Sequence, residues 1–164
     1  MSAVKVIDKF DGTEYGFLSN FHPCKVTYNG ITYNHSEGAF QAQKTLNEEE
    51  RQFISTLTPG KSKRACGRHG LSENGSLFKI KLRADWEEVK DQIMYQIVKA
   101  KFEQNPNLKE KLINTGSAEL IEGTTWHDNY WGNCTCEKCK NIEGQNHLGK
   151  ILMQVRNEFK EQGE

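Results

Sequence analysis

The strongest constraint in the sequence is an amphipathic pattern that begins after Asp85. Apolar side chains recur every three to four residues from Trp86 to Ala100, and Asn105-Pro106 ends the pattern. This spacing is that of an α-helix with one apolar face, and a proline at its end cannot continue the helix. We therefore predict a long helix here, with Asp85 as its N-terminal cap and an apolar face that is buried against other parts of the chain.

The remaining patterns predict shorter elements around this helix. Asn29-Gly30, between two β-prone runs, is the strongest short-range signal for a hairpin. Residues 11–13 indicate a turn, and the polar residues 72–76 indicate a loop. The other predicted elements are strands over 4–10 and 119–122, helices beginning near Glu37, Asn47 and Pro59, a helix ending at Gly116 and a last helix with an apolar stripe over 148–159. The sequence thus predicts an α+β fold, predominantly helical with a small β-hairpin or sheet, in a single domain over 1–164.

Composition and charge exclude several classes of protein. Hydrophobic residues make up 35% of the 164 residues and charged residues 27%, which is typical of a globular protein rather than a disordered one. Lys and Arg number 22, as do Asp and Glu, and this balance argues against a protein that holds duplex nucleic acid through its phosphates. No apolar run approaches the roughly 18 residues of a membrane span, and no signal peptide is evident, so we expect a cytoplasmic protein without a membrane partner.

Three polar residues after Ser36 fall on one side of a predicted helix. Ser36 is a good N-cap, and Glu37, Gln41 and Lys44 follow at the i, i+4 and i+7 positions. A carboxylate, an amide and an amine on one stripe can line a ligand cleft. They can equally form an ordinary solvated helix face, and the stripe by itself does not decide between the two.

An aromatic-rich segment surrounds Asp128. Trp126, Tyr130 and Trp131 lie within six residues of chain that has no helical or strand period, although aromatic residues make up only 10% of the sequence. Aromatic planes beside a carboxylate can stack a base or a sugar and tune the acid. The alternative is a structural loop whose aromatic rings fill the core and whose aspartate caps a turn.

Three cysteines form a C-x-C-x2-C run, Cys134, Cys136 and Cys139. Thiolates at this spacing can share one Zn²⁺, with the fourth ligand supplied by a histidine (His127 or His147) or by Cys24. Such a zinc would be structural, because four protein ligands leave no open position. The alternative is a knuckle of free thiols, and the sequence leaves both open.

The densest basic patch is made up of Lys61, Lys63, Arg64 and Arg68. Arginine binds phosphate or carboxylate in a two-pronged fashion, but a basic patch on a helix is also a common solvated face. The glycine-rich phosphate loops of dinucleotide and nucleoside triphosphate sites are absent from the sequence, as is the G-x-S-x-G elbow of hydrolases. We expect that catalysis requires no cofactor.

Taken together, these segments resemble the NADAR/YbiA-like family over roughly residues 16–158. The motifs that carry the resemblance are Phe17–Phe21 (FLSNF), Ser36–Lys44 (SEGAFQAQK), Gly67-Arg68, Asp85–Lys90 (DWEEVK), Met94, Ala100–Phe102 (AKF), Asp128–Gly132 (DNYWG) and Asn146–Met153 (NHLGKILM). The resemblance implies an α-rich α+β fold and an N-glycosidase acting at C1 of a ribose-phosphate or ADP-ribose unit. Substrates in the family are phosphoribosylamino-pyrimidine intermediates of riboflavin synthesis and ADP-ribose attached to guanine, so the expected partner is a small nucleotide or ribose-phosphate molecule, or ADP-ribosylated nucleic acid.

The resemblance also implies roles for individual residues. Glu37 matches the catalytic glutamate, Lys44 the lysine of the family's Q-A-Q-K motif and Asp128 the second acidic group. The residues expected to contact substrate are Asn20, Phe21, Gln41, Arg68, Trp86, Lys90, Trp131 and Asn146. Two departures concern substrate choice: Gly38 stands where the family often has histidine, and the cysteine run replaces a glycine-rich segment found in many members.

N-glycoside cleavage builds positive charge at C1 and at the ring oxygen, so a nearby anion lowers the barrier. Glu37 in the first turn of a helix is suited to that role, and Asp128 among aromatic rings to protonating the leaving nitrogen. Lys44 offers a second route, in which its amine attacks C1 and forms a Schiff base, and the sequence does not choose between lysine and water. We expect Glu37, Lys44 and Asp128 to meet around one sugar carbon. The alternatives are a sensor that binds ADP-ribose or NAD without chemistry, and a zinc-knuckle interaction protein.

Overall fold

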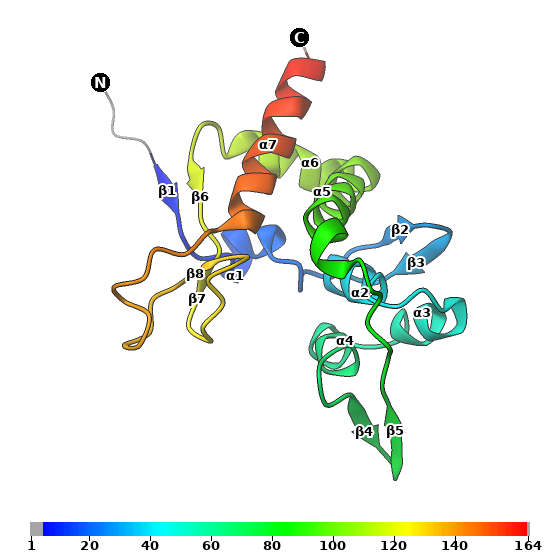
Figure 1. The fold of residues 1–164 in the computed structure, drawn as a ribbon. Coiled ribbons are helices and arrows are strands. Elements are labelled where there is room, and N and C mark those ends of the chain that lie inside the picture. The colour runs from blue at the N-terminus through cyan, green and yellow to red at the C-terminus, as the bar shows by residue number, and fades with distance from the viewer. Residues whose placement is uncertain (1–4, 164) are drawn as a thin grey trace. The chain divides into compact units, whose positions relative to one another are not determined.

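The computed structural model describes residues 5–163 (Figure 1). They form two compact units. The central unit is Asn20–Asn105, and the terminal unit combines the chain up to Ser19 with the chain from Pro106 onward. Within the described residues there are seven α-helices and four short two-stranded ladders. The predicted α+β fold with helix predominant is confirmed, whereas the single domain over 1–164 stays a prediction.

The central unit begins with the predicted hairpin. Strands β2 (Val26–Tyr28) and β3 (Ile31–Tyr33) pair antiparallel, and both turn residues have positive φ, 50° at Asn29 and 84° at Gly30. This is the backbone of a type I′ turn, which matches the twist of the paired strands. The alternation of the strands buries one face of the hairpin, and β2 packs against helix α5.

Three short helices follow the hairpin. They are α2 (Ser36–Ala42), α3 (Glu48–Ile54) and α4 (Pro59–Ala65). Asn47 caps α3 by accepting a hydrogen bond from the Glu50 N–H at 2.9 Å, and Thr58 caps α4 ahead of a proline in its first turn. These predicted starts are confirmed. Because α2 packs against α3, α4 and α5, it is the central helix of this unit.

A second hairpin occupies the segment predicted to be a loop. Strands β4 (Leu71–Glu73) and β5 (Ser76–Phe78) pair antiparallel around Asn74 and Gly75, whose φ values are 51° and 78°. The loop prediction for 72–76 is therefore wrong. Asn74-Gly75 is the same turn signal that identified the first hairpin, and it lay within a run whose polar residues hid the strands.

Gly75 and Gly60 provide a matched pair of alanine substitutions. We expect Gly75→Ala to lower the free energy of unfolding by about 1 kcal/mol, because alanine is strained at the φ of +78° that this turn requires. Gly60 lies inside α4, and an added Cβ would meet nothing within 4 Å. Gly60→Ala is therefore expected to raise the free energy of unfolding by about 0.5–1 kcal/mol. Urea denaturation of both variants measures the difference. Equal effects of the two would contradict the turn assignment.

The long predicted helix is α5 (Trp86–Gln104). Its buried face includes Trp86, Ile93 and Ile97, as the apolar spacing predicts. Asp85 lies at the N-cap position, but its side chain makes no capping hydrogen bond. Its two carboxylate oxygens instead accept hydrogen bonds from the guanidinium of Arg83 at 2.7 and 3.1 Å, so the predicted capping role of Asp85 is wrong.

The terminal unit is built on helices α6 (Pro106–Asn114) and α7 (His147–Gln162), which pack together. The predicted apolar stripe of the last helix is buried along α7. Strand β1 (Val6–Ile7) pairs parallel with β6 (Glu119–Leu120), so both predicted strands are present but shorter. Residue 4 of the first predicted strand lies outside the described residues.

Residues 11–13 do not form the isolated turn that the sequence indicates. Gly12–Tyr15 is a one-turn helix, α1, because the Gly16 N–H donates to the Gly12 carbonyl and closes one turn of α-helix. A 3₁₀ turn, η1 (Gly16–Leu18), follows it. Strands β7 (Gly123–Thr124) and β8 (Asn133–Cys134) pair parallel and bracket the aromatic segment. None of the helices described here has the length and apolar character needed to cross a membrane.

Candidate active site

The predicted Glu37 helix starts one residue earlier than expected, because His35 is its cap. The His35 Nδ1 atom accepts a hydrogen bond from the Gly38 N–H at 2.9 Å. Ser36, the predicted cap, instead donates its hydroxyl to the side-chain oxygen of Asn20 at 2.9 Å. The Asn20 carbonyl also accepts from the Glu37 N–H at 2.9 Å. Asn20 therefore positions the start of α2, and its predicted contact with substrate stays a prediction.

Glycine at position 38 leaves room for the His35 ring. A Cβ added at Gly38 would lie 2.7 Å from the His35 Cε1 atom, which is closer than atoms approach. The ring is held from its other side as well, because its Nε2 lies 2.9 Å from the Leu57 carbonyl. Since a carbonyl only accepts, Nε2 carries the proton and Nδ1 the lone pair. Both ring nitrogens are thus engaged by backbone groups, and His35 is a structural residue at the start of α2.

His35 makes stability sensitive to acid. Burial lowers the pKa of the imidazole, and the hydrogen bond to Leu57 raises it by a smaller amount. The neutral ring therefore stabilises the fold fully above about pH 6.5, and this contribution is lost as the pH falls through the lowered pKa. We expect the free energy of unfolding to decrease between about pH 7 and pH 5, and to decrease less in His35→Asn, which keeps a capping oxygen but does not titrate. An unchanged decrease in the variant would contradict this role.

Glu37 and Gln41 form a buried pair on α2. The Gln41 Nε2 donates to the Glu37 Oε1 at 2.9 Å, and the two residues are only 7% and 5% exposed. The predicted stripe is thus not a solvated face over these two residues. A glutamine that binds a carboxylate through its amide nitrogen has its oxygen free to accept from another group. That oxygen is buried and has no hydrogen-bond partner among the described residues.

Lys44 lies beside a tryptophan, two residues after α2 ends at Ala42, so the prediction that it shares this helix with Glu37 and Gln41 is wrong. The chain leaves the helix in a tighter turn, in which the Lys44 N–H donates to the Gln41 carbonyl at 3.1 Å. Its Nζ is 5.8 Å from the centroid of the Trp86 ring, and the Phe40 ring packs against the same tryptophan at 5.2 Å. Burial lowers the pKa of the Lys44 amine, while the charge of Glu37 acts to raise it and the charge of Lys90 to lower it further. A larger share of this amine is therefore neutral at a given pH than in an exposed lysine.

The other basic residues of the predicted site and of the basic patch differ in their surroundings: some form ion pairs and others are exposed to solvent. Lys90 forms an ion pair with Glu87 at 2.5 Å, and Lys61 pairs with Glu73 at 2.5 Å across to the second hairpin. Arg68 lies in the turn after α4 and is exposed, as are Arg64 and Phe21. Their predicted contacts with substrate stay predictions.

Ser62 lies beside α2, at Gly38, and the sequence did not single it out. It lies on α4 and is fully buried, and its hydroxyl has no hydrogen-bond partner within residues 5–163. The hydroxyl is 3.5 Å from the position of a Cβ on Gly38. A serine in the middle of a basic helix gives no sequence signal of this placement, since only the packing of α2 on α4 creates it.

Asp128, in the terminal unit, caps a turn. Its Oδ1 accepts hydrogen bonds from the Tyr130 N–H at 3.1 Å and the Trp131 N–H at 2.9 Å. This geometry agrees with the structural alternative for the aspartate. Two statements about Asp128 stay predictions. One is that it donates a proton to the leaving nitrogen, and the other is that it lies with Glu37 and Lys44 around one sugar carbon.

Rings and an amide fix the start of α7. Tyr130 packs on the His147 ring at 4.3 Å and edge-on to Trp131 at 4.8 Å. Asn146 has a φ of 50° and uses both ends of its amide, since Nδ2 donates to the Leu120 carbonyl and Oδ1 accepts from the Glu122 N–H, each at 2.9 Å. These bonds hold the segment that follows β6. Substrate contacts by Trp131 and Asn146 stay predictions.

The three cysteines of the run lie together with one histidine. The ligand atoms of His127, Cys134, Cys136 and Cys139 all lie within 4.8 Å of one another. Of the candidates for a fourth ligand, the structure thus selects His127. The His147 Nε2 lies instead 2.9 Å from the Gln145 side-chain oxygen. This cluster has the donors to hold a metal ion.

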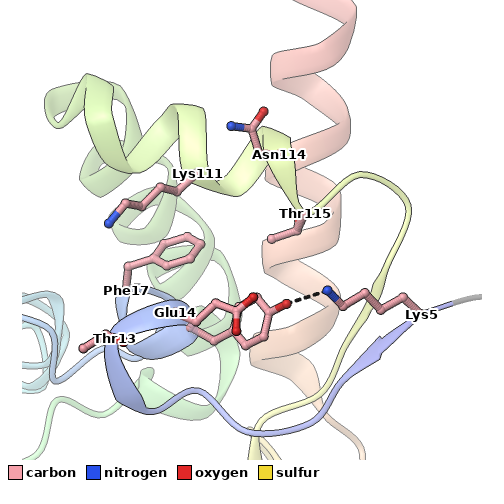
Figure 2. A pocket seen from close by; sticks show the side chains of 8 residues that line it. Lys5, Thr13, Glu14, Phe17, Lys111, Asn114 and Thr115 are labelled. Atoms are coloured by element: carbon pink, nitrogen blue, oxygen red, sulfur yellow. Dashed lines mark hydrogen bonds between the residues drawn. The ribbon is translucent and has the colours of Figure 1, made fainter.

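A cavity of about 440 Å³ lies in the terminal unit (Figure 2). It is lined by Lys5, Thr13, Glu14, Tyr15, Phe17, Lys111, Asn114 and Thr115. The Lys5 amine donates to the Tyr15 hydroxyl at 2.6 Å, and the Lys111 amine lies 5.9 Å from the centre of the Phe17 ring. None of the predicted site residues lines this cavity, neither those of the central unit nor those of the terminal unit.

Comparison with known proteins identifies the family. The family model of the NADAR domain matches residues 9–160, which include nearly all of both units. The chain belongs to the NADAR family. The N-glycosidase YbiA of Escherichia coli is 37% identical over 146 residues, which are 89% of this chain and 82% of that protein. The family expected from the sequence motifs is therefore confirmed.

Other NADAR relatives agree with this assignment. An N-glycosidase of Nostoc punctiforme is 34% identical and aligned over 89% of this chain and 86% of its own length. The chloroplastic riboflavin biosynthesis protein PYRR of Zea mays is 32% identical over 88% of this chain, which corresponds to 23% of that larger protein. The NMR structure of E. coli YbiA matches with a TM-score of 0.77 at 33% identity, covering 99% of this chain and 89% of that one. The α+β fold is thus that of a solved relative.

Proposed function

We propose that this protein is an N-glycosidase that hydrolyses the N-glycosidic bond of a ribose-phosphate or ADP-ribose compound. The observation that carries the proposal is the buried pair on α2, in which Gln41 donates to the Glu37 carboxylate, followed just after the helix by Lys44, whose amine lies beside Trp86. The names of the relatives, N-glycosidase and riboflavin biosynthesis protein, support this class of reaction. The candidate substrates are phosphoribosylamino-pyrimidines and ADP-ribosylated guanine, the latter free or in nucleic acid.

The chemistry of the cluster fits the charge that develops in the reaction. A carboxylate at Glu37 stabilises positive charge at C1 and at the ring oxygen as the bond to the base breaks. Its hydrogen bond from Gln41 fixes its orientation in advance, so little reorganisation is needed when the charge forms. In this proposal the buried, unpartnered oxygen of Gln41 would accept a hydrogen bond from a ribose hydroxyl.

Lys44 provides the nucleophile in this proposal. Its neutral amine bonds to C1, the bond from C1 to the base nitrogen breaks, and the ring oxygen takes a proton as the ribose opens. Asp128 supplies the proton for the leaving nitrogen. Water then adds to the imine carbon and releases Lys44, so that one water is consumed for each bond cleaved. Burial against Trp86 supports this role, because it lowers the pKa of the amine that must be neutral to attack.

The remaining predicted contacts complete the proposal. Trp86 and Trp131 would pack against the base or the sugar, and Arg68, Lys90, Asn20, Phe21 and Asn146 would contact phosphate or ribose. The substrate is then a small molecule or a modified nucleotide in a larger nucleic acid. The cytoplasmic location expected from the sequence stays a prediction.

Product analysis tests the proposed function. The protein is incubated with a phosphoribosylamino-pyrimidine and with ADP-ribosylated guanosine, and free base and reducing sugar are quantified together by mass spectrometry. The proposal expects equal amounts of base and sugar from at least one substrate. A protein that binds either compound, by calorimetric titration, yet releases no base from any would instead be the ADP-ribose or NAD sensor, and the glycosidase proposal would fail.

A further inference from the structure

The cysteine cluster brings four potential metal ligands close enough together to share one ion. The His127 Nδ1 lies 3.3 Å from the Cys136 Sγ and 3.4 Å from the Cys139 Sγ. Four ligands at the usual zinc bond lengths of about 2.3 Å to sulfur and about 2.0 Å to nitrogen stand about 3.6 Å apart along a sulfur–nitrogen edge. Two of the sulfur–nitrogen separations are therefore close to the tetrahedral value, and no pair among the four ligand atoms is more than 4.8 Å apart.

The loop around the cluster has almost no apolar core of its own. Of residues 125–145, only Gly132, Cys134 and Cys139 are buried. Trp126 is 54% exposed and Ile142 is 53% exposed. Long loops with little secondary structure need some other source of order, and a structural metal supplies it in folds that lack a sufficient core. Two of the three buried residues here are potential metal ligands.

The backbone also favours a bound metal. His127 has a φ of 68°, which is a costly conformation for a residue other than glycine. In this conformation its backbone N–H donates to the Cys134 Sγ at 3.3 Å while its ring reaches the other two sulfurs. A hydrogen bond to sulfur from the chain around the site is the kind of outer contact that orients a thiolate ligand.

From these observations we infer that His127, Cys134, Cys136 and Cys139 bind one Zn²⁺ in a closed structural site, and that this ion orders the loop that carries Asp128 and Trp131. On binding, the three thiols release their protons to solvent and the neutral imidazole coordinates through Nδ1. Four protein ligands leave no position for water or substrate, so the ion itself takes no part in catalysis.

The ligands lie on both sides of Asp128 in the chain. His127 directly precedes it, and the Cys134 N–H donates to the side-chain oxygen of the next residue, Asn129, at 2.8 Å. Zinc at the cluster would therefore fix both ends of the Asp128 turn. This second part of the inference rests on the proposed function, since the position of Asp128 matters for turnover only if Asp128 acts on the substrate. The first part, zinc binding, does not.

Metal analysis of the purified full chain tests the site. We expect about one zinc per chain by plasma mass spectrometry, lost in Cys136→Ser and in His127→Ala. Two matched controls, Cys24→Ser and His147→Gln, replace a cysteine and a histidine outside the cluster and should keep the metal. Absence of zinc from wild-type protein purified with zinc present, or its retention in both ligand variants, would overturn the inference. An intact disulfide within the cluster, detected by thiol counting without reductant, would also overturn it.

Limited proteolysis tests the ordering of the loop. Lys138 and Lys140 are exposed trypsin sites inside the loop, and Lys79 and Lys81 are exposed sites in the central unit. After chelation of zinc we expect cleavage at the two loop lysines to become at least about tenfold faster, because the loop opens without its metal. Cleavage at the two central lysines should keep its rate. Unchanged cleavage of the loop in metal-free protein would overturn the structural role.

Assays on the same samples separate this inference from the proposed function. Zinc-bound protein that releases no base would refute the glycosidase and leave the metal site standing. Active protein that never contains zinc would refute the metal site and leave the glycosidase proposal standing. Base release that falls on zinc removal, while zinc content and loop cleavage change together, supports both.

Discussion

Glu37→Gln is expected to lower turnover about 10³-fold and to leave substrate affinity nearly unchanged, because the loss affects only the charged transition state. Glutamine has the shape of glutamate and can still accept the hydrogen bond that Gln41 donates to position 37 at 2.9 Å. It lacks the negative charge that stabilises the developing cation at C1. The melting temperature should therefore stay close to that of the wild type.

The measurement is kcat and KM for base release on the substrate that wild-type protein cleaves, with the melting temperature recorded for each sample. Glu49→Gln is the matched control, because Glu49 lies exposed in the first turn of α3. Glu37→Gln with wild-type kcat would show that the carboxylate takes no part in the reaction. An equal loss in both variants would point to a general effect of the lost charge.

Lys44→Arg is expected to lower kcat by about 10³-fold or more, because a guanidinium stays protonated and cannot attack C1. The variant keeps the positive charge beside Trp86, so it separates a nucleophilic amine from a cation that only binds substrate. Lys81→Arg, at an exposed position of the same unit, is the control and should keep wild-type activity.

The pH profile and chemical trapping add two independent readouts for Lys44. Burial lowers the pKa of its amine, so kcat/KM should rise with pH through that lowered pKa as the neutral amine accumulates. Borohydride added during turnover should reduce the imine and give a substrate-dependent mass gain on Lys44 alone. An active Lys44→Arg variant, with no adduct on wild-type protein, would establish water as the nucleophile and leave the glycosidase assignment intact.

Local signals in the sequence predicted the elements that depend on nearby residues. The Asn29-Gly30 hairpin and the Asn47 cap follow from short-range backbone chemistry, and the long helix from Trp86 follows from its apolar spacing. The two cap predictions failed because another partner took the side chain. Asp85 bonds Arg83 instead of capping its helix, and the Ser36 hydroxyl turns to Asn20.

In the candidate site, too, the sequence predicted the local features and missed those that depend on packing between distant segments. The motifs placed Glu37 and Gln41 on one helix at the correct spacing, whereas Lys44, predicted on the same helix, lies two residues beyond its end at Ala42. The motifs also identified the family that the comparisons confirm. They did not show that this stripe is buried rather than solvated, because burial depends on helices α3, α4 and α5 that cover α2. The sequence also left two histidines and Cys24 as rival ligands, and the structure selected His127.

The sequence by itself determined the family and the helical character of the fold, and it singled out the residues that the proposed reaction would use. These follow from residue order and spacing, which the chain carries whatever its surroundings. Only the tertiary structure decided that the Glu37–Gln41 pair is buried, that the Lys44 amine has a lowered pKa beside Trp86, and that one histidine joins three thiols. Burial, desolvation and ligand geometry arise from packing between segments distant in sequence, and no local pattern specifies them.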